Sequence, residues 1–242
     1  MENLKSGIGI WQILKESVIT DIIAKAGFDF TLLDLEHGQH TLSSIQECIY
    51  AAKASRLNTI VRVPQIDYQS LVQIIDTGVD GILFPHVETC NQINDIVSQT
   101  LLPPNGQKSF SPFVPRYEFG HTQVNKKKDP LLGILIESKL GLKNLEDLLD
   151  NSFVDFIYFG AYDLSVEIGL PGQIFSEEIK EQLIKLNEAA KKYNKKVFSI
   201  FRNKEELRFL QSLMIEYPIS SVDTSHLFQK LSIEVQKYNS II

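Results

Sequence analysis

Short apolar runs alternate with longer stretches of helical spacing from one end of the chain to the other. Runs such as LLGILIE and VDFIYFG are almost continuously apolar, which is typical of strands covered on both faces. Stretches such as SSIQECIYAAKAS and SEEIKEQLIKLNEAAKKYN place apolar residues on one face of a helix. This alternation predicts βα units around a parallel sheet. The predicted strands are Gly7–Trp11, Phe30–Leu35, Thr59–Val63, Gly81–Pro85, Leu132–Glu137, Phe156–Gly160, Lys196–Phe201 and Ser220–Asp223.

The number and regularity of these units favour a closed barrel. Eight units span the 242 residues, and β/α barrels of about 250 residues commonly form a single domain. The rival architecture is a doubly wound open sheet, but the sequence has neither a GxGxxG fingerprint nor a P-loop. We therefore expect an α/β fold, an eight-stranded β/α (TIM) barrel formed by one domain over residues 1–242.

Capping residues and one long irregular segment complete this outline. Ser43, Ser176 and Asn203 are expected to cap helices, because their side-chain oxygens can accept from the first backbone N–H groups. The longest irregular stretch runs from about Leu102 to Pro130. A loop of that length in a compact domain is more often functional than accidental, and it could fold over one end of the barrel.

Composition and charge exclude several classes of protein. The net charge is -6 and the pI is near 5.4, without the dense Lys/Arg stripe of a nucleic-acid-binding protein. Cys48 and Cys90 lie far apart and make no zinc-like spacing. No apolar run approaches the roughly 18 residues of a membrane span, and the first residues lack the apolar core of a signal peptide. We expect a cytoplasmic protein without nucleic-acid or membrane partners.

Polar residues follow the predicted strands at the end where a barrel carries its chemistry. Catalytic groups of β/α barrels project from the C-terminal ends of the strands. Ionisable residues at that rim are costly unless they bind an ion, a charged substrate or one another. The candidates are Asp34, Glu36 and His37 after the second strand, Arg62 on the third, Glu137 on the fifth, Asp163 after the sixth, and Asp223 and Thr224 at the eighth.

Glu137 and Asp163 are candidate metal ligands. They lie at the ends of neighbouring predicted strands, which would bring two carboxylates within reach of one cation. Mg²⁺ is usually held by one or two carboxylates, with water and substrate oxygens completing its shell. The alternative is that each carboxylate pairs with a nearby lysine or arginine, or caps a helix. Spacing alone leaves both possibilities open.

His37 is the candidate general base. It ends a predicted strand beside acids, and histidine is the side chain that most often performs this role near neutral pH. His40 forms an HxxH pattern with it, which we interpret as incidental rather than as a zinc site. His86 follows the fourth strand and could point into the site or merely flank it.

Arg62 would place a fixed cation at the mouth of the barrel. A guanidinium there can bind a carboxylate through two parallel hydrogen bonds. The alternative is a structural ion pair with Asp34 or Glu36, and the sequence does not separate the two roles.

The blocks LLDLEHG, TIVRVP, DTGVDGILFPHV, LIES, YFGAYDLSVEIGLPGQ and SVDTS resemble, in order, those of the HpcH/HpaI class II aldolase family. The match runs from about Gly7 to the last helix. It implies a barrel of the phosphoenolpyruvate/pyruvate type and a lyase that acts on pyruvate with a divalent ion such as Mg²⁺, Mn²⁺ or Co²⁺. The products would be an oxo acid and an aldehyde.

The resemblance also implies roles for individual residues. Glu137 and Asp163 would ligate the metal, and His37 would be the general base. Asp76 matches the acid that raises the basicity of that histidine. Arg62 matches the arginine that stabilises the enolate and holds the pyruvate oxygens.

Two positions depart from the family pattern, and they bear on the substrate. Leu135 stands where many members have a glutamine that contacts substrate, and Tyr162 stands where a small residue precedes the metal-binding aspartate. Tyr162 and Asp163 would therefore both contact the substrate, together with Arg62. The alternatives are a citrate lyase β-like lyase acting on a coenzyme A thioester, or a catalytically silent barrel. The family also suggests a homo-oligomer, a hexamer or trimer, whose C-terminal helix exchanges between subunits.

Overall fold

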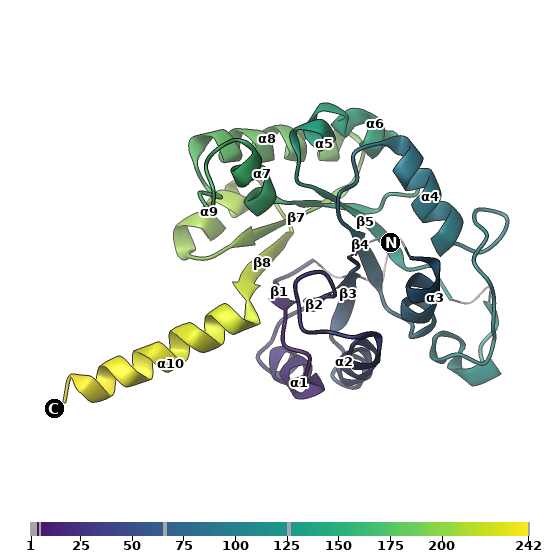
Figure 1. Cartoon of the computed structure of the whole chain (residues 1–242), viewed down its shortest axis with the longest axis horizontal. Helices are drawn as coiled ribbons and strands as arrows, with labels where there is room; N and C mark the ends of the chain where they lie inside the picture. The colour runs from purple at the N-terminus through teal and green to yellow at the C-terminus, as the bar shows by residue number, and fades with distance from the viewer. Residues whose placement is uncertain (1–3, 5, 65–66, 125–126, 242) are drawn as a thin grey trace.

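Eight parallel strands close into a barrel. The computed structural model describes residues 4, 6–64, 67–124 and 127–241. Each strand pairs with the next along the chain, and β1 pairs with β8 to close the sheet (Figure 1). The predicted barrel is confirmed, and the doubly wound alternative is wrong. The strands are β1 (Gly9–Gln12), β2 (Phe30–Asp34), β3 (Asn58–Arg62), β4 (Gly81–Phe84), β5 (Leu131–Ile136), β6 (Phe156–Phe159), β7 (Lys196–Phe201) and β8 (Tyr217–Val222).

The helices surround the strands. Ser176 and Asn203 cap α8 and α9 as predicted, whereas the prediction for Ser43 is wrong. Thr41 caps α2, because its side chain accepts from Ser44 N while the Ser44 hydroxyl accepts from Thr41 N. The helices are α1 (Ser17–Lys25), α2 (Leu42–Ala54), α3 (Tyr68–Asp76), α4 (Cys90–Thr100), η1 (Pro115–Gly120), α5 (Lys139–Lys143), α6 (Leu145–Asp150), α7 (Ala161–Glu167), α8 (Glu177–Lys192), α9 (Lys204–Ser212) and α10 (Asp223–Asn239).

Aromatic rings fill the interior of the barrel below the site. Phe198 packs against Phe156 and stacks on Tyr217, with ring centroids 4.7 and 4.6 Å apart. Two glycines make room for the rings: a Cβ at Gly9 would lie 2.1 Å from Phe30, and one at Gly133 would lie 2.1 Å from Phe156. The interior is therefore a packed core, and a ligand can enter only at its ends.

The long segment after α4 lies beside α3 rather than over the barrel. Its helical turn, η1, contacts α3 on the outside of the molecule (Figure 1). Among the described residues, none of this segment lines the pocket at the barrel mouth. The expectation that it could cover one end of the barrel is not met, because its buried anchors Arg116 and Tyr117 hold it at the side.

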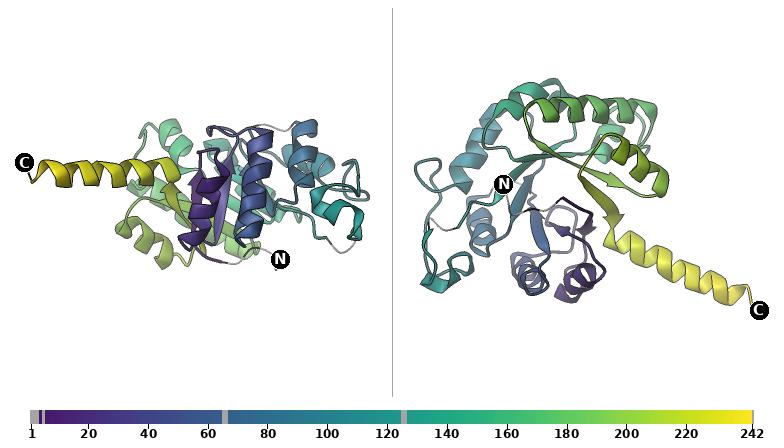
Figure 2. Two further views of the ribbon diagram at one scale, coloured as in Figure 1. Left: turned by 90° about the horizontal axis from the view of Figure 1, so that it is seen from below. Right: turned by 180° about the vertical axis from the view of Figure 1, so that it is seen from behind.

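Helix α10 projects away from the barrel in every view (Figures 1 and 2). Of its residues only Asp223 is buried. The Asp223 carboxylate accepts from the backbone N–H groups of Ile13 and Leu14 at 3.0 to 3.2 Å, so it fixes the start of the helix to the end of β1. Asp223 is thus a structural residue.

No helix in the described part of the chain is long and apolar enough to cross a membrane.

Candidate active site

A pocket of about 260 Å³ opens at the C-terminal ends of the strands. The polar residues predicted from the ends of β2, β3, β5 and β6 converge there on an apolar floor that includes Leu135 and Ile200. This is the end of a β/α barrel that carries catalytic groups. The residues with the chemistry are Asp34, His37, Arg62, Glu137, Tyr162 and Asp163.

Arg62 is held rigidly at the floor of this pocket. Its Nε and Nη2 donate to the two oxygens of Asp34 at 2.9 and 2.5 Å, and its Nη1 lies 2.9 Å from Glu36. The guanidinium carbon is 4.6 Å from the centre of the Trp11 ring. Burial opposes its charge, but the hydrogen bonds with Asp34 prevail and raise the pKa of Arg62. The sequence left open whether Arg62 forms an ion pair with Asp34 or Glu36. In the structure it pairs with both.

Glu137 is a buried carboxylate with a strongly shifted pKa. It is 6% exposed, and its Oε1 accepts from the backbone N–H of His86 at 2.8 Å. Burial is the main cause that raises the pKa of Glu137 to about 7, with the charges of Asp163 and Glu36 adding to it and His86 opposing it. A carboxylate that is costly to ionise in the free protein gains most from a bound cation.

Gly160 allows Glu137 and the start of α7 to come together. A Cβ at Gly160 would lie 2.4 Å from the Cβ of Glu137. Helix α7 begins immediately afterwards and places Asp163 in its first turn, where it lines the same pocket. The two carboxylates predicted as metal ligands are thus in one pocket. The described residues contain no group of three or more histidine, cysteine or acidic side chains that could hold a metal.

His86 joins the two acidic sides of the mouth. Its Nε2 lies 3.2 Å from Glu36 and its Nδ1 lies 2.9 Å from Glu137. The residue has a φ of 55°, in the left-handed region. The sequence left open whether His86 faces the site or flanks it, and the structure shows that it bridges the acids at the rim.

His37 is exposed at the mouth and lines the pocket. Its backbone N–H donates to Asp34 at 3.3 Å, so the carboxylate that holds Arg62 also shapes this turn. Within the described parts of the chain, its imidazole has no hydrogen-bond partner. His40, in contrast, is buried between Ser44 and the carbonyl of Gln12, and burial lowers its pKa. The two imidazoles therefore do not form a metal-binding pair.

Asp76 lies away from His37 in the same chain. It ends α3 and lines a separate pocket between α2 and α3, on the outside of the barrel. Its Oδ1 pairs with the buried Nζ of Lys108 at 2.8 Å. The structure of one chain does not bring Asp76 to the histidine that it was expected to assist.

Three residues of the site were missed by the sequence analysis. Trp11 and Tyr158 sit inside apolar strands, where a packing role is the ordinary interpretation, yet both line the pocket and hydrogen-bond to each other at 2.9 Å. Arg202 directly follows β7, and its hydrogen bonds with Glu206, with a smaller contribution from Tyr162, raise the pKa of its guanidinium. Its place after an apolar run was the available signal.

The comparisons with known proteins agree with this fold. The family model described as HpcH/HpaI aldolase/citrate lyase matches residues 7–212. The chain is 32% identical to the hydroxypyruvate/pyruvate aldolase of Roseobacter denitrificans over 182 residues, which are 73% of this chain and 71% of that protein. It is 30% identical to the 2-keto-3-deoxy-L-rhamnonate aldolase of Escherichia coli over 189 residues, 74% and 70% of the two chains.

A solved structure extends the likeness to the whole fold. The HpcH/HpaI aldolase/citrate lyase family protein from Burkholderia cenocepacia superposes with a TM-score of 0.89 at 22% identity, covering 97% of this chain and 95% of that one. The fold and the pocket together are those of a β/α-barrel enzyme. The chain belongs to the HpcH/HpaI aldolase/citrate lyase family, as its sequence blocks predicted.

Proposed function

We propose that the protein is a divalent-metal-dependent aldolase that cleaves a 4-hydroxy-2-oxo acid into pyruvate and an aldehyde, or joins them. The observation that carries the proposal is the convergence of Glu137, Asp163, Arg62 and His37 on one pocket. The two relatives named above are aldolases, which supports a lyase of the pyruvate type.

The residues present fit a hard cation such as Mg²⁺, Mn²⁺ or Co²⁺. Glu137 and Asp163 offer carboxylate oxygens in one pocket, and burial together with the charge of Asp163 raises the pKa of Glu137. A divalent ion would remove that repulsion, and substrate and water oxygens would complete its shell. When bound, such an ion stabilises negative charge that develops on a substrate oxygen.

The chain's own groups would perform the remaining steps. His37 would remove the proton of the C4 hydroxyl, since its imidazole faces the pocket without another hydrogen-bond partner in the described part of the chain. Breaking the C3–C4 bond then leaves negative charge on the pyruvate enolate. Arg62, held in place by Asp34 and Glu36, would stabilise that charge without having to reorganise.

Replacing His37 with alanine is expected to lower kcat/KM for aldol cleavage by about 10² to 10⁴-fold, the usual contribution of a general base. The measurement is release of pyruvate from 4-hydroxy-2-oxo acids with Mg²⁺, Mn²⁺ or Co²⁺, with and without a chelator. His40→Asn serves as the matched control, because His40 is buried away from the pocket. Turnover that persists in chelator, or that survives the loss of His37, contradicts the proposal.

The alternatives have less support. A lyase acting on a coenzyme A thioester would need a basic groove for the nucleotide phosphates, and the pocket of about 260 Å³ is small for such a ligand. A catalytically silent barrel was suggested by Leu135 and Tyr162. Leu135 is buried and Tyr162 is exposed, and both line the pocket together with Glu137 and Asp163, so the two carboxylates are still present in it.

Helix α10 supports a homo-oligomeric assembly. Its apolar side chains Leu227, Phe228, Leu231 and Val235 are 49 to 72% exposed, and a patch of this kind marks an interaction surface. We propose that the helix packs against a neighbouring barrel in a trimer or hexamer. Light scattering after size-exclusion chromatography is expected to give a multiple of the chain mass, and a mass near 27.5 kDa would exclude assembly.

Assembly would also explain the position of Asp76. If this carboxylate supports a histidine, the histidine belongs to a neighbouring chain, because Asp76 and His37 line different pockets of one chain. His37→Ala and Asp76→Ala chains, each weakly active alone, should then regain activity when they are refolded together. The one-domain organisation and the cytoplasmic location stay predictions from the sequence.

A further inference from the structure

Tyr158 is a buried phenol in the floor of the pocket that the mechanism above does not use. Side chains alternate along a strand, so Tyr158 of β6 faces the same interior as Phe156, one layer nearer the C-terminal end. It is 5% exposed and lines the pocket together with Leu135, its register partner on β5. Because Leu135 and Ile200 are aliphatic, the Tyr158 hydroxyl is a polar group set in an apolar part of the floor.

Trp11 holds the Tyr158 hydroxyl in place. Its indole Nε1 donates to the hydroxyl oxygen at 2.9 Å, and the two rings meet edge to face with their centroids 5.3 Å apart. A phenol oxygen that accepts a hydrogen bond still carries a hydrogen of its own to donate. Within the described parts of the chain, no side chain or carbonyl accepts that hydrogen. The hydroxyl is therefore a preorganised donor that is available to a ligand in the pocket.

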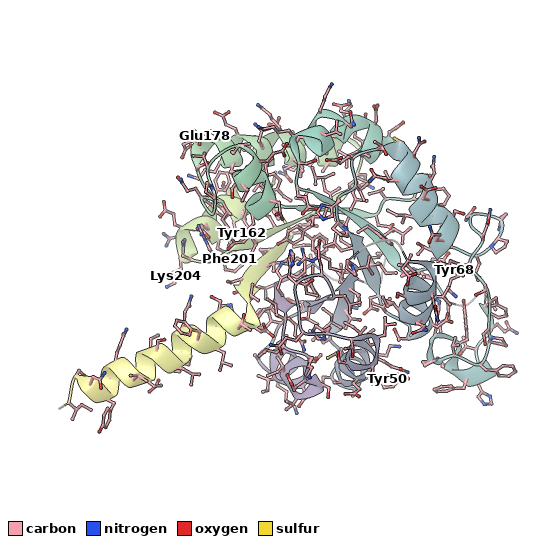
Figure 3. All side chains as sticks on the ribbon, viewed as in Figure 1. Tyr50, Tyr68, Tyr162, Glu178, Phe201 and Lys204 are labelled. Atoms are coloured by element: carbon pink, nitrogen blue, oxygen red, sulfur yellow. The ribbon has the colours of Figure 1, made fainter. Side chains whose placement is uncertain are left out.

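The phenol stays protonated at neutral pH. Burial raises the pKa of Tyr158, and the hydrogen bond from Trp11, which acts in the opposite direction, does not reverse that shift. Tyr158 is thus a neutral donor rather than a base. Tyr162 also lines the pocket, but it lies on α7 and is 46% exposed (Figure 3). Water competes for an exposed hydroxyl of this kind, whereas the hydroxyl of Tyr158 is sheltered from it.

Arg62 leaves room for a second donor to an anionic ligand. Each of its three nitrogen atoms already faces an acid, with Nε and Nη2 at Asp34 and Nη1 at Glu36. The guanidinium carbon lies 4.6 Å from the centre of the Trp11 ring, whose N–H meets Tyr158. Arg62 and Tyr158 therefore contact one indole in a pocket of about 260 Å³, which keeps a small ligand at Arg62 close to the phenol.

We propose that the Tyr158 hydroxyl donates a hydrogen bond to an oxygen of the bound oxo acid, as a neutral partner of Arg62. This inference rests on the proposed aldolase function. The phenol keeps its proton throughout, so no proton transfer is assigned to it. A hydrogen bond to a carboxylate or enolate oxygen is charge-assisted and stronger than one between neutral groups. A ligand without an oxygen at this place would leave the buried donor unpaired and would be bound less well.

Tyr158→Phe tests the proposal, because it removes the hydroxyl and keeps the ring in the floor. The variant is expected to lose about ten- to a hundredfold in kcat/KM for cleavage of 4-hydroxy-2-oxo acids with Mg²⁺, the effect of losing a hydrogen bond to a charged group. Calorimetric titration with pyruvate and Mg²⁺ locates the bond. A matching loss of affinity assigns it to an oxygen that pyruvate already carries, and a loss in kcat alone assigns it to the enolate oxygen. Unchanged kinetics in folded Tyr158→Phe would overturn the inference.

A second background separates direct contact with the substrate from support of Trp11. If Tyr158 acted only by holding the indole that lies against Arg62, its hydroxyl would have no effect once the indole N–H is gone. In the Trp11→Phe background, Tyr158→Phe should still lower kcat/KM by about tenfold, because the hydroxyl contacts the substrate itself. An absence of further loss in the double variant would show a purely structural role and refute the proposal.

Tyr217→Phe is the matched control. Tyr217 is also a buried tyrosine of the barrel, but it begins β8 at the opposite end, where its hydroxyl lies 3.5 Å from the carbonyl oxygen of Leu4. It does not line the pocket, so its kinetics should match those of the wild type. A loss in Tyr217→Phe equal to that in Tyr158→Phe would reflect disturbance of the core and would contradict the inference.

A separate measurement distinguishes failure of the inference from failure of the proposed function. Exchange of the pyruvate methyl hydrogens for deuterium, followed by nuclear magnetic resonance with Mg²⁺ and without any aldehyde, reports enolisation by the wild-type protein. Exchange and cleavage that are equally fast in Tyr158→Phe refute the role of Tyr158 only. The absence of both exchange and cleavage in the wild type refutes the aldolase function and this inference with it.

Discussion

Replacing Arg62 with methionine is expected to lower the free energy of unfolding by about 3 to 5 kcal/mol, the usual cost of removing one partner from a buried ion pair. Asp34 is 2% exposed and binds the guanidinium through both oxygens. Without Arg62, this carboxylate and Glu36 would remain in an apolar pocket without their cation. Aldol cleavage should also be lost, because the same guanidinium is proposed to stabilise the enolate.

Urea denaturation at neutral pH measures this effect. Lys192→Met is the matched control: it breaks the pair with Glu146, whose side chains are 62% and 60% exposed, and exposed pairs contribute about 1 kcal/mol or less. In the double variant Asp34→Asn, Arg62→Met, the loss should be smaller than the sum of the single losses, since the stranded charge has been removed. A loss for Arg62→Met no larger than that of the control would contradict the prediction.

The metal-free protein is expected to lose stability as the pH rises from about 5 to 8. The pKa of Glu137 is about 7 in the folded chain, against a usual value of 4.5. Over this range the folded state holds a proton that the unfolded state has released, so the contribution is complete below pH 4.5 and is lost as the pH rises through 7. A shift of this size corresponds to a contribution on the order of 3 kcal/mol.

Calorimetric melting in the presence of a chelator measures this dependence, and Glu137→Gln provides the comparison. The variant keeps the shape of the side chain but cannot ionise, so the part of the pH slope that belongs to Glu137 should vanish and the variant should exceed the wild type in stability at pH 8. Mg²⁺ should stabilise the wild type more at pH 8 than at pH 5, because binding needs the ionised carboxylate. Parallel pH profiles for the two proteins would rule out the assignment.

The sequence was informative where local periodicity determines position. All eight strands occur where the apolar runs predicted them, although β1 begins at Gly9 rather than Gly7 and β8 begins at Tyr217 rather than Ser220. Glu137 and Asp163 could be placed in one pocket because they follow neighbouring strands of a parallel sheet, whose C-terminal ends meet.

What could not be predicted depends on contacts between distant segments. The bridge from Glu36 through His86 to Glu137 joins the ends of three strands, and its geometry follows from an unusual backbone angle that no residue pattern reveals. In the sequence, Arg202 follows an apolar run, as many surface arginines do. The structure shows that it pairs with Glu206 of α9.

The backbone conformation of His86 determines which variants would be recovered from a library randomised at this position. The φ of 55° directs the amide hydrogen at Glu137, and glycine, asparagine and aspartate adopt this conformation at little cost. Asparagine and glycine should therefore dominate among folded clones, while valine and isoleucine should be depleted however well they suit the surface. The conformation of the main chain, rather than the chemistry of the imidazole, would decide which residues are accepted at position 86.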